Sequence, residues 1–168
     1  MFIDIRHRTA NDVPLMSALL RTFGEAFNDL KTYTANPPSE GYLRQLLGGD
    51  SFIALAALKR GVVVGGIAAY ELKKFEQERS EIYIYDLAVA SEHRREGIAT
   101  ALIEKLKEIA VRRKACLIFV QADTGVEDKP AIALYTKLGR REDVLHFDIA
   151  VSGRPITGLS TRLVTPDS

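Results

Sequence analysis

The chain has 168 residues, of which 46% are hydrophobic and 27% charged, a balance typical of one globular domain with a substantial buried core. Its 23 lysines and arginines nearly match its 22 aspartates and glutamates, so no overall basic charge argues for nucleic-acid binding. The sequence shows neither a signal peptide nor an apolar run long enough to span a membrane, so we expect one cytoplasmic domain over residues 1–168. The sequence leaves open whether the protein forms a homodimer.

The first half of the chain is predicted to form three strands and two helices. Strands are expected where β-favouring or alternating residues occur, over residues 2–8, 51–58 and 62–72. Helices are expected where apolar residues recur at helical spacing behind the capping residues Thr9 and Ser39, over residues 10–27 and 40–47. Residues 28–38 have a loop-like composition. The aromatic residues of this region belong either to the core or to a substrate entrance, and they are Phe23, Phe27, Tyr33 and Tyr42.

The second half predicts a strand, helix and strand crossover, followed by a further helix and strand. Strands are expected from Ser80, over residues 116–122 and, as a last core strand, over 144–150; helices are expected over 98–113 and 130–138. Residues 151–168 are expected to add one more strand or to fray. Cys116, the single cysteine, lies in the apolar run CLIFV and is expected to be buried. Hairpins and a crossover together predict an α/β fold, with a mixed sheet flanked by helices on both faces.

An anion-binding turn is predicted between the strand from Ser80 and the helix that follows it. Residues Arg94 to Ala99 fit the pattern R-x-x-G-x-A, in which Gly97 lets the backbone approach a diphosphate and Arg94 and Arg95 supply cationic donors. The alternative is a solvated basic turn whose glycine serves backbone geometry alone. Its place after a buried strand and at a helix start favours the anion site.

A carboxylate interrupts the same strand. Asp86 lies within the apolar run IYIYDLAV, where a buried charge is costly unless it is hydrogen-bonded, paired or facing a wet cleft. It is therefore either a functional residue or a structural aspartate paired with a buried group. A kink in the strand would turn Asp86 and the N–H groups after it toward a ligand. Glu81, at the start of the strand, is either an exposed strand-end residue or a ligand contact.

Polar groups of the last third of the chain are further candidates. Tyr135, on a predicted helix, is either core filler or a general acid whose phenol gives a proton to a basic leaving group. His146 and Asp148 project to one side of the predicted last strand, either as an outward salt bridge or as the lining of a pocket for a cationic ligand. No cysteine and histidine cluster has the spacing of a metal site, so no metal is expected.

These segments resemble the GCN5-related N-acetyltransferase superfamily in their order and in the stretches LAVASEHRREGIATALI and ALYTKLG. From about Phe52 to Ile149 the chain more closely resembles type I aminoglycoside 3-N-acetyltransferases, in the stretches FIALAAL, FEQERSEIYIYDLAV, VQAD and HFDI. The resemblance implies the GNAT acyl-CoA N-acyltransferase fold, with acetyl-CoA as cofactor. It also implies direct acetyl transfer to the 3-amino group of a polycationic, gentamicin-like aminoglycoside, and hence antibiotic resistance. The alternatives are acetylation of another amine, in a polyamine or a protein, and a non-catalytic CoA-binding module.

The resemblance also implies roles for individual residues. The CoA pyrophosphate would be held by the turn and the helix start, which comprise Arg94, Arg95, Glu96, Gly97, Ile98, Ala99 and Thr100. The pantetheine arm would lie along the backbone of Leu87, Ala88 and Val89. The chemistry of the reaction suggests in addition that Asp86 deprotonates the acceptor amine, directly or through water, and that Tyr135 protonates the departing thiolate. Carboxylates would bind the cationic acceptor, and the candidates are Glu81, Asp86, Asp123 and Asp148.

Overall fold

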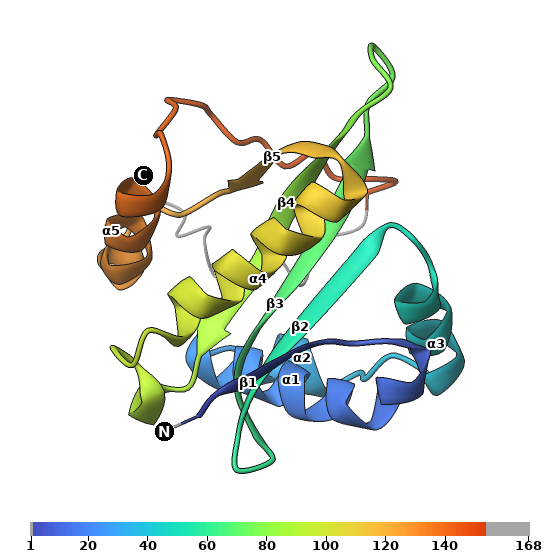
Figure 1. Cartoon of the computed structure of the whole chain (residues 1–168), viewed down its shortest axis with the longest axis vertical. Helices are drawn as coiled ribbons and strands as arrows, with labels where there is room; N and C mark the ends of the chain where they lie inside the picture. Colours follow the sequence, from blue (N-terminus) through green and yellow to red (C-terminus); the bar gives the residue numbers. More distant parts are fainter. Residues whose placement is uncertain (1, 154–168) are drawn as a thin grey trace. The chain divides into compact units, whose positions relative to one another are not determined.

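A five-stranded sheet dominates the first of two units into which the chain divides (Figure 1). The structure, a computed structural model, describes residues 2–153. The first unit ends at Gln121 and the second begins at Ala122, and each unit is described by itself. None of the helices within residues 2–153 has the length and apolar character needed to cross a membrane.

The sheet follows the order of the chain and is mixed, as predicted. Its strands are β1 (Asp4–His7), β2 (Phe52–Lys59), β3 (Val62–Lys73), β4 (Ser80–Val89) and β5 (Ala115–Val120). Neighbouring strands from β1 to β4 are antiparallel, whereas β5 runs parallel to β4. The helix α4 (Ile98–Arg113) makes the crossover between those two strands, because parallel neighbours need a connection that returns along the sheet.

Helices before β2 cover one face of the sheet. They are α1 (Val13–Ala26), which follows a short 3-10 turn, α2 (Leu30–Thr34) and α3 (Glu40–Gly48). Thr9 and Asp12 form the predicted capping arrangement, and the Ser39 side chain accepts a hydrogen bond from the Tyr42 N–H. Side chains of α1 and α3 pack on Phe52 and Ala54 of β2 and on Ala88 of β4. This core fixes the helices over the β2 to β4 part of the sheet.

The opposite face is covered by α4. Because side chains alternate along a strand, Ile53, Leu55, Ile67 and Ile82 point away from α1, and all four are fully buried. The helix contributes the matching buried stripe, which consists of Ile98, Leu102, Leu106 and Ile109. The continuous burial of β2 from Phe52 to Leu58 is what a strand covered on both faces requires.

Three expectations about the elements are wrong. Residues 28–38 are not all loop, because α2 forms there with Asp29 capping the N–H of Thr32. Cys116 is exposed rather than buried, since it lies on a strand at the edge of the sheet. Residues 144–150 form no strand, because they pair with no strand among the described residues. An alternation of apolar and polar residues cannot by itself supply the hydrogen-bonded neighbour that a strand needs.

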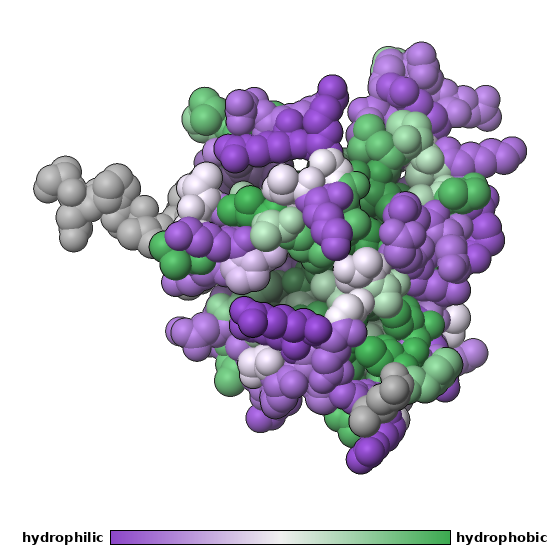
Figure 2. Space-filling view, turned by 60° about the vertical axis from the view of Figure 1, so that its left-hand side comes forward, coloured by the Kyte–Doolittle hydropathy of each residue, from purple (hydrophilic) through white to green (hydrophobic). Residues whose placement is uncertain are grey.

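The second unit contains a 3-10 turn (Val126–Asp128) and helix α5 (Lys129–Leu138), with Pro130 in its first turn and Gly139 following, as predicted. Apolar side chains after α5 are exposed, including Leu145, Phe147 and Ile149. Figure 2 shows hydrophobic side chains gathered between hydrophilic ones on the face that it displays. Residues 154–168, with most of the predicted final strand or tail, lie outside the described residues.

Candidate active site

The predicted anion-binding turn joins β4 to α4. Arg95 and Gly97 have φ angles of 65° and 79°, in the left-handed region that favours glycine. A Cβ added to Gly97 would meet nothing within 4 Å, so the glycine serves the backbone conformation and leaves the space over the turn open. The first intrahelical bond of α4 runs from the Ala101 N–H to the Gly97 carbonyl. The N–H groups of the residues between them therefore lie at the helix start, where an anion is stabilised.

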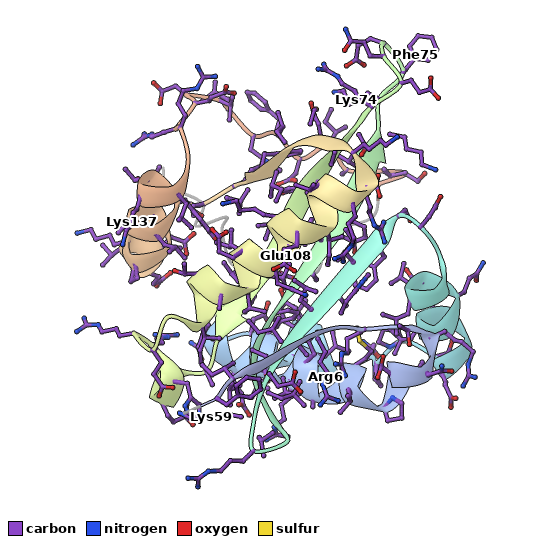
Figure 3. The ribbon with its side chains drawn as sticks, viewed as in Figure 1. Arg6, Lys59, Lys74, Phe75, Glu108 and Lys137 are labelled. Atoms are coloured by element: carbon purple, nitrogen blue, oxygen red, sulfur yellow. The ribbon has the colours of Figure 1, made fainter. Side chains whose placement is uncertain are left out.

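A cluster of three polar side chains ties this turn to the β2–β3 hairpin. The Lys59 ammonium donates to Glu96 Oε2 at 2.7 Å and lies 3.3 Å from His93 Nδ1, which is 3.3 Å from Glu96 Oε1. The hydrogen bonds from Lys59 and His93 hold the pKa of Glu96 below its ordinary value. Figure 3 shows Lys59 at the hairpin end of the sheet, beside the turn. The carboxylate of Glu96 therefore anchors the turn instead of repelling an anion above it.

β5 pairs with the first part of β4 only, so β5 does not cover the edge of the last residues of β4. The β4–β5 register stops at the pair Ile84 and Val120, whereas β4 continues five residues further, to Val89. The Ala90 N–H donates to the Val64 carbonyl of β3, and successive residues of a strand direct their N–H groups to opposite sides. The N–H groups of Leu87 and Val89 accordingly point away from β3, toward the edge where the ladder with β5 has ended.

A β-bulge in β4 sets the direction of Asp86. Asp86 pairs with Ala68 of β3 and Ile84 pairs with the next residue, Ala69, so Tyr85 is the extra residue. Without it, alternation would place Tyr83 and Asp86 on opposite faces. With it, both face α1 and α2, as does Glu81. The strand kink expected beside Asp86 is thus present.

Asp86 is hydrogen-bonded to a residue of α2. The Tyr33 hydroxyl donates to Asp86 Oδ1 at 2.9 Å. Burial first, and then the negative charge of Asp86, raise the pKa of Tyr33 above its ordinary value, so the phenol is protonated at neutral pH. Of the two sequence alternatives for Asp86, a structural partner is therefore present, and it is the neutral hydroxyl of Tyr33.

Several tyrosine rings lie in contact with one another along β3 and β4, the strands that meet at Asp86. Tyr70 and Tyr85 meet edge to face at 6.0 Å, and Tyr85 meets Tyr83 in the same way at 5.6 Å. Tyr83 stacks on Phe119 at 4.7 Å. The Glu81 carboxylate lies farther along β4, 3.5 Å from the Lys74 ammonium, with 19% of its side chain exposed. The face thus combines two carboxylates with aromatic rings, groups that suit a cationic, hydroxyl-rich ligand.

A small hollow lies beside the anion-binding turn. It lies between the last turns of α1 and the segment after β4, and its lining is Thr22, Glu25, Ala26, Ala90, Ser91, Glu92 and Arg94. Arg94 therefore borders a space that is also lined by Glu25 of α1 and by Glu92, which follows β4. Among residues 2–153 no three histidine, cysteine or acidic side chains form a metal-binding group.

The remaining predicted site residues belong to the second unit. Tyr135 is half-buried on α5. Asp123 Oδ1 accepts a hydrogen bond from the Thr124 N–H, and its own N–H donates to Asp128 Oδ2. His146 Nε2 lies 2.9 Å from Asp148 Oδ1, which agrees with the salt-bridge alternative for this pair. The functions predicted for Tyr135, Asp123 and Asp148 stay predictions.

A comparison with known protein families assigns the chain to one of them. A profile described as the Acetyltransferase (GNAT) family matches residues 15–139, three quarters of the chain. The chain therefore belongs to the GNAT acetyltransferase family, whose members take the acetyl group from acetyl-CoA. The open turn at Gly97 and the outward N–H groups at the end of β4 are features that fit the pyrophosphate and the pantetheine arm of this cofactor.

Solved structures similar to this chain include aminoglycoside acetyltransferases. HMB0005, an aminoglycoside acetyltransferase from an uncultured soil metagenomic sample, is 69% identical, with a TM-score of 0.90 over 90% of this chain and 100% of that chain. A second one of the same kind of origin, meta-AAC0020, was solved with sisomicin and is 30% identical, with a TM-score of 0.81 over 89% of this chain and 97% of that one.

Curated relatives are longer proteins. N-acetyltransferase family 8 member 2 of Rattus norvegicus is 34% identical over 100 residues, which make up 60% of this chain and 42% of that protein. The chain thus spans about two fifths of the length of this relative.

Replacing Lys59 with Met should weaken cofactor binding more than turnover. The substitution leaves Glu96 without its strongest partner, so the turn loses its anchor and a carboxylate is released beside the anion site. Since charge-assisted hydrogen bonds are stronger than neutral ones, we expect KM for acetyl-CoA to rise severalfold in steady-state thiol-release assays. Lys73→Met is the matched control, because Lys73 pairs with Asp50 at an exposed site. Equal KM values for both variants would contradict the anchoring function.

Proposed function

We propose that this protein transfers the acetyl group of acetyl-CoA to the 3-amino group of a gentamicin-like aminoglycoside, and that it confers resistance in the cytoplasm by doing so. The observation that carries the proposal is Asp86, a carboxylate turned by a β-bulge onto a tyrosine-lined face, close to the end of β4 where the anion-binding turn begins. The 69% identity to an aminoglycoside acetyltransferase supports the substrate class. The resemblance to type I 3-N-acetyltransferases supports the position on the sugar.

In this proposal the end of β4 and the start of α4 bind the donor. Gly97 and the helix N–H groups of Ile98, Ala99 and Thr100 hold the pyrophosphate, together with Arg94, Arg95 and the backbone of Glu96. The backbone of Leu87, Ala88 and Val89 lines the pantetheine arm. When bound, acetyl-CoA supplies an activated thioester carbonyl. The outward N–H group of Leu87 or Val89 stabilises the negative charge that develops on the carbonyl oxygen.

The acceptor amine is an ammonium ion at neutral pH, and it must lose a proton before it can act as a nucleophile. Asp86 takes this proton, directly or through a water molecule. Tyr135 returns a proton to the departing thiolate sulfur. Glu81, Asp123 and Asp148 attract the other ammonium groups of the polycationic sugar, and the tyrosine rings around Asp86 pack against its apolar ring faces. Holding the amine and the thioester in register supplies much of the acceleration.

Free-thiol release from acetyl-CoA, measured across a panel of amines, tests this function. We expect turnover with gentamicin and sisomicin, and two-dimensional NMR of the product should locate the acetyl group on the 3-nitrogen. Spermidine and lysine peptides should give rates near the background hydrolysis of acetyl-CoA. Turnover restricted to spermidine or peptides would identify a different amine substrate. Thiol release with none of the amines, despite acetyl-CoA binding, would point to a non-catalytic CoA-binding module.

A further inference from the structure

We propose that Tyr33 is a positioning residue for catalysis, and that its hydroxyl orients the carboxylate of Asp86 and stabilises its charged form. This inference rests on the proposed function of Asp86 as proton acceptor. The two residues are 53 positions apart, and the 2.9 Å hydrogen bond between them connects α2 to the bulged part of β4. The contact thus links α2 to the tyrosine-lined face of the sheet on which Asp86 lies. We call this face the acceptor face.

The Tyr33 ring is held in place by α1. It packs against Phe23 and Phe27 with ring centroids 6.1 Å and 5.8 Å away. At Gly24 the two helices approach closely, since an added Cβ would lie 3.0 Å from Leu30 Cα and 3.2 Å from Tyr33 Cβ. A residue without a side chain is therefore needed at position 24 for α2 to sit where the hydroxyl reaches Asp86.

The hydroxyl is a dependable donor to the carboxylate. Burial is the largest cause of the raised pKa of Tyr33, followed by the charge of Asp86, so the phenol keeps its proton through the neutral range. Titratable groups that also act on this pair include Tyr85 of β4, Tyr70 of β3 and Asp29, which precedes α2. A hydrogen bond to the charged form of a carboxylate favours that form. Loss of the donor should therefore require a higher pH for Asp86 to act as a base.

The test is Tyr33→Phe, which keeps the ring contacts and removes the hydroxyl. We expect kcat/KM for the aminoglycoside to fall about 10- to 100-fold, because a hydrogen bond to a charged group is among the stronger ones in proteins. KM for acetyl-CoA should not change. The acid limb of the kcat/KM profile should move to higher pH, because activity is present above the carboxyl pKa and is lost as the pH falls through it. A loss of packing alone would not move that limb.

Thr34→Val is the matched control on the same helix. The Thr34 hydroxyl donates to the Leu30 carbonyl at an exposed position, so its removal changes α2 without touching Asp86. Gly24→Ala is the second variant, which retains the Tyr33 hydroxyl but displaces α2. We expect its acid limb to move to higher pH, as in Tyr33→Phe. The thermal unfolding temperature of Tyr33→Phe should stay close to that of the wild type.

Failure of this inference is distinguishable from failure of the proposed function. If Tyr33→Phe has the kcat/KM and acid limb of the wild type while Asp86→Asn is strongly impaired, Tyr33 has no positioning function and Asp86 keeps its own. If Asp86→Asn is also unimpaired, the proposed function of Asp86 is wrong, and the inference fails with it. If Tyr33→Phe and Thr34→Val lower kcat/KM equally with unmoved acid limbs, the effect belongs to helix packing and overturns the inference.

Discussion

Asp86→Asn should lower kcat/KM for an aminoglycoside acceptor about 10²- to 10⁴-fold, the range for removal of a general base. The amide keeps the size of the side chain and can still meet the Tyr33 hydroxyl through its oxygen, so the acceptor face should stay intact. What it cannot do is accept a proton from an ammonium ion. The loss should appear in kcat, in thiol-release assays at saturating acetyl-CoA, and should diminish at high pH, where part of the amine is already neutral.

Asp50→Asn is the control for this substitution. Asp50 is exposed and pairs with Lys73, outside the acceptor face, so its amide variant should have the kinetics of the wild type. A value of kcat/KM for Asp86→Asn within a few-fold of the wild type would mean that another group, or bulk water, takes the proton.

Gly66→Ala should strongly destabilise the folded protein. Gly66 lies in β3 under α1, and an added Cβ would lie 2.4 Å from Leu19 Cδ1 and 2.5 Å from the Leu55 carbonyl oxygen of β2. The leucine can rotate, but the carbonyl belongs to the backbone of the neighbouring strand. Since overpacking a tight core costs about 1–3 kcal/mol, we expect the free energy of unfolding to fall by about 3 kcal/mol in urea titrations.

Gly41→Ala is the same chemical change at a site without neighbours. An added Cβ there would meet nothing within 4 Å, and the residue lies in α3. Alanine favours a helix over glycine by up to about 1 kcal/mol, so this variant should be as stable as the wild type or more so. If both alanine variants unfold at the same urea concentration, the close approach of α1 to β3 is not a determinant of stability.

The sequence carried strong information on the long elements. The helices α1, α3 and α4 and the strands β2 to β4 were predictable to within a few residues, because each has a clear apolar period and a capping or turn signal. The five-residue α2 was not, since so short a helix depends on tertiary contacts, in this protein those around Gly24 and Tyr33. The strand predicted at 144–150 was wrong because alternation shows only that one face is apolar.

In the candidate site, too, local features were predictable from the sequence and contacts between distant residues were not. Residue type and local context were enough to single out Asp86 and the turn at Gly97, since a charge in an apolar strand and a glycine before a helix are local features. The Tyr33–Asp86 and Lys59–Glu96 contacts join residues 53 and 37 positions apart. No periodicity reports such a contact, and the sequence indicated only that Tyr33 lies among aromatic residues near the entrance or in the core.

The extra residue at Tyr85 has a consequence for how the two substrates are linked. The bulge falls directly after Ile84, the last residue of β4 that pairs with β5. A bulge bends a strand and increases its twist. This one irregularity therefore turns Asp86 toward α1 and α2, and it also directs the end of β4 away from β5. Under the proposed function, donor and acceptor recognition therefore depend on a single point in the backbone, and a change in the length of β4 there should alter the affinity for both substrates together.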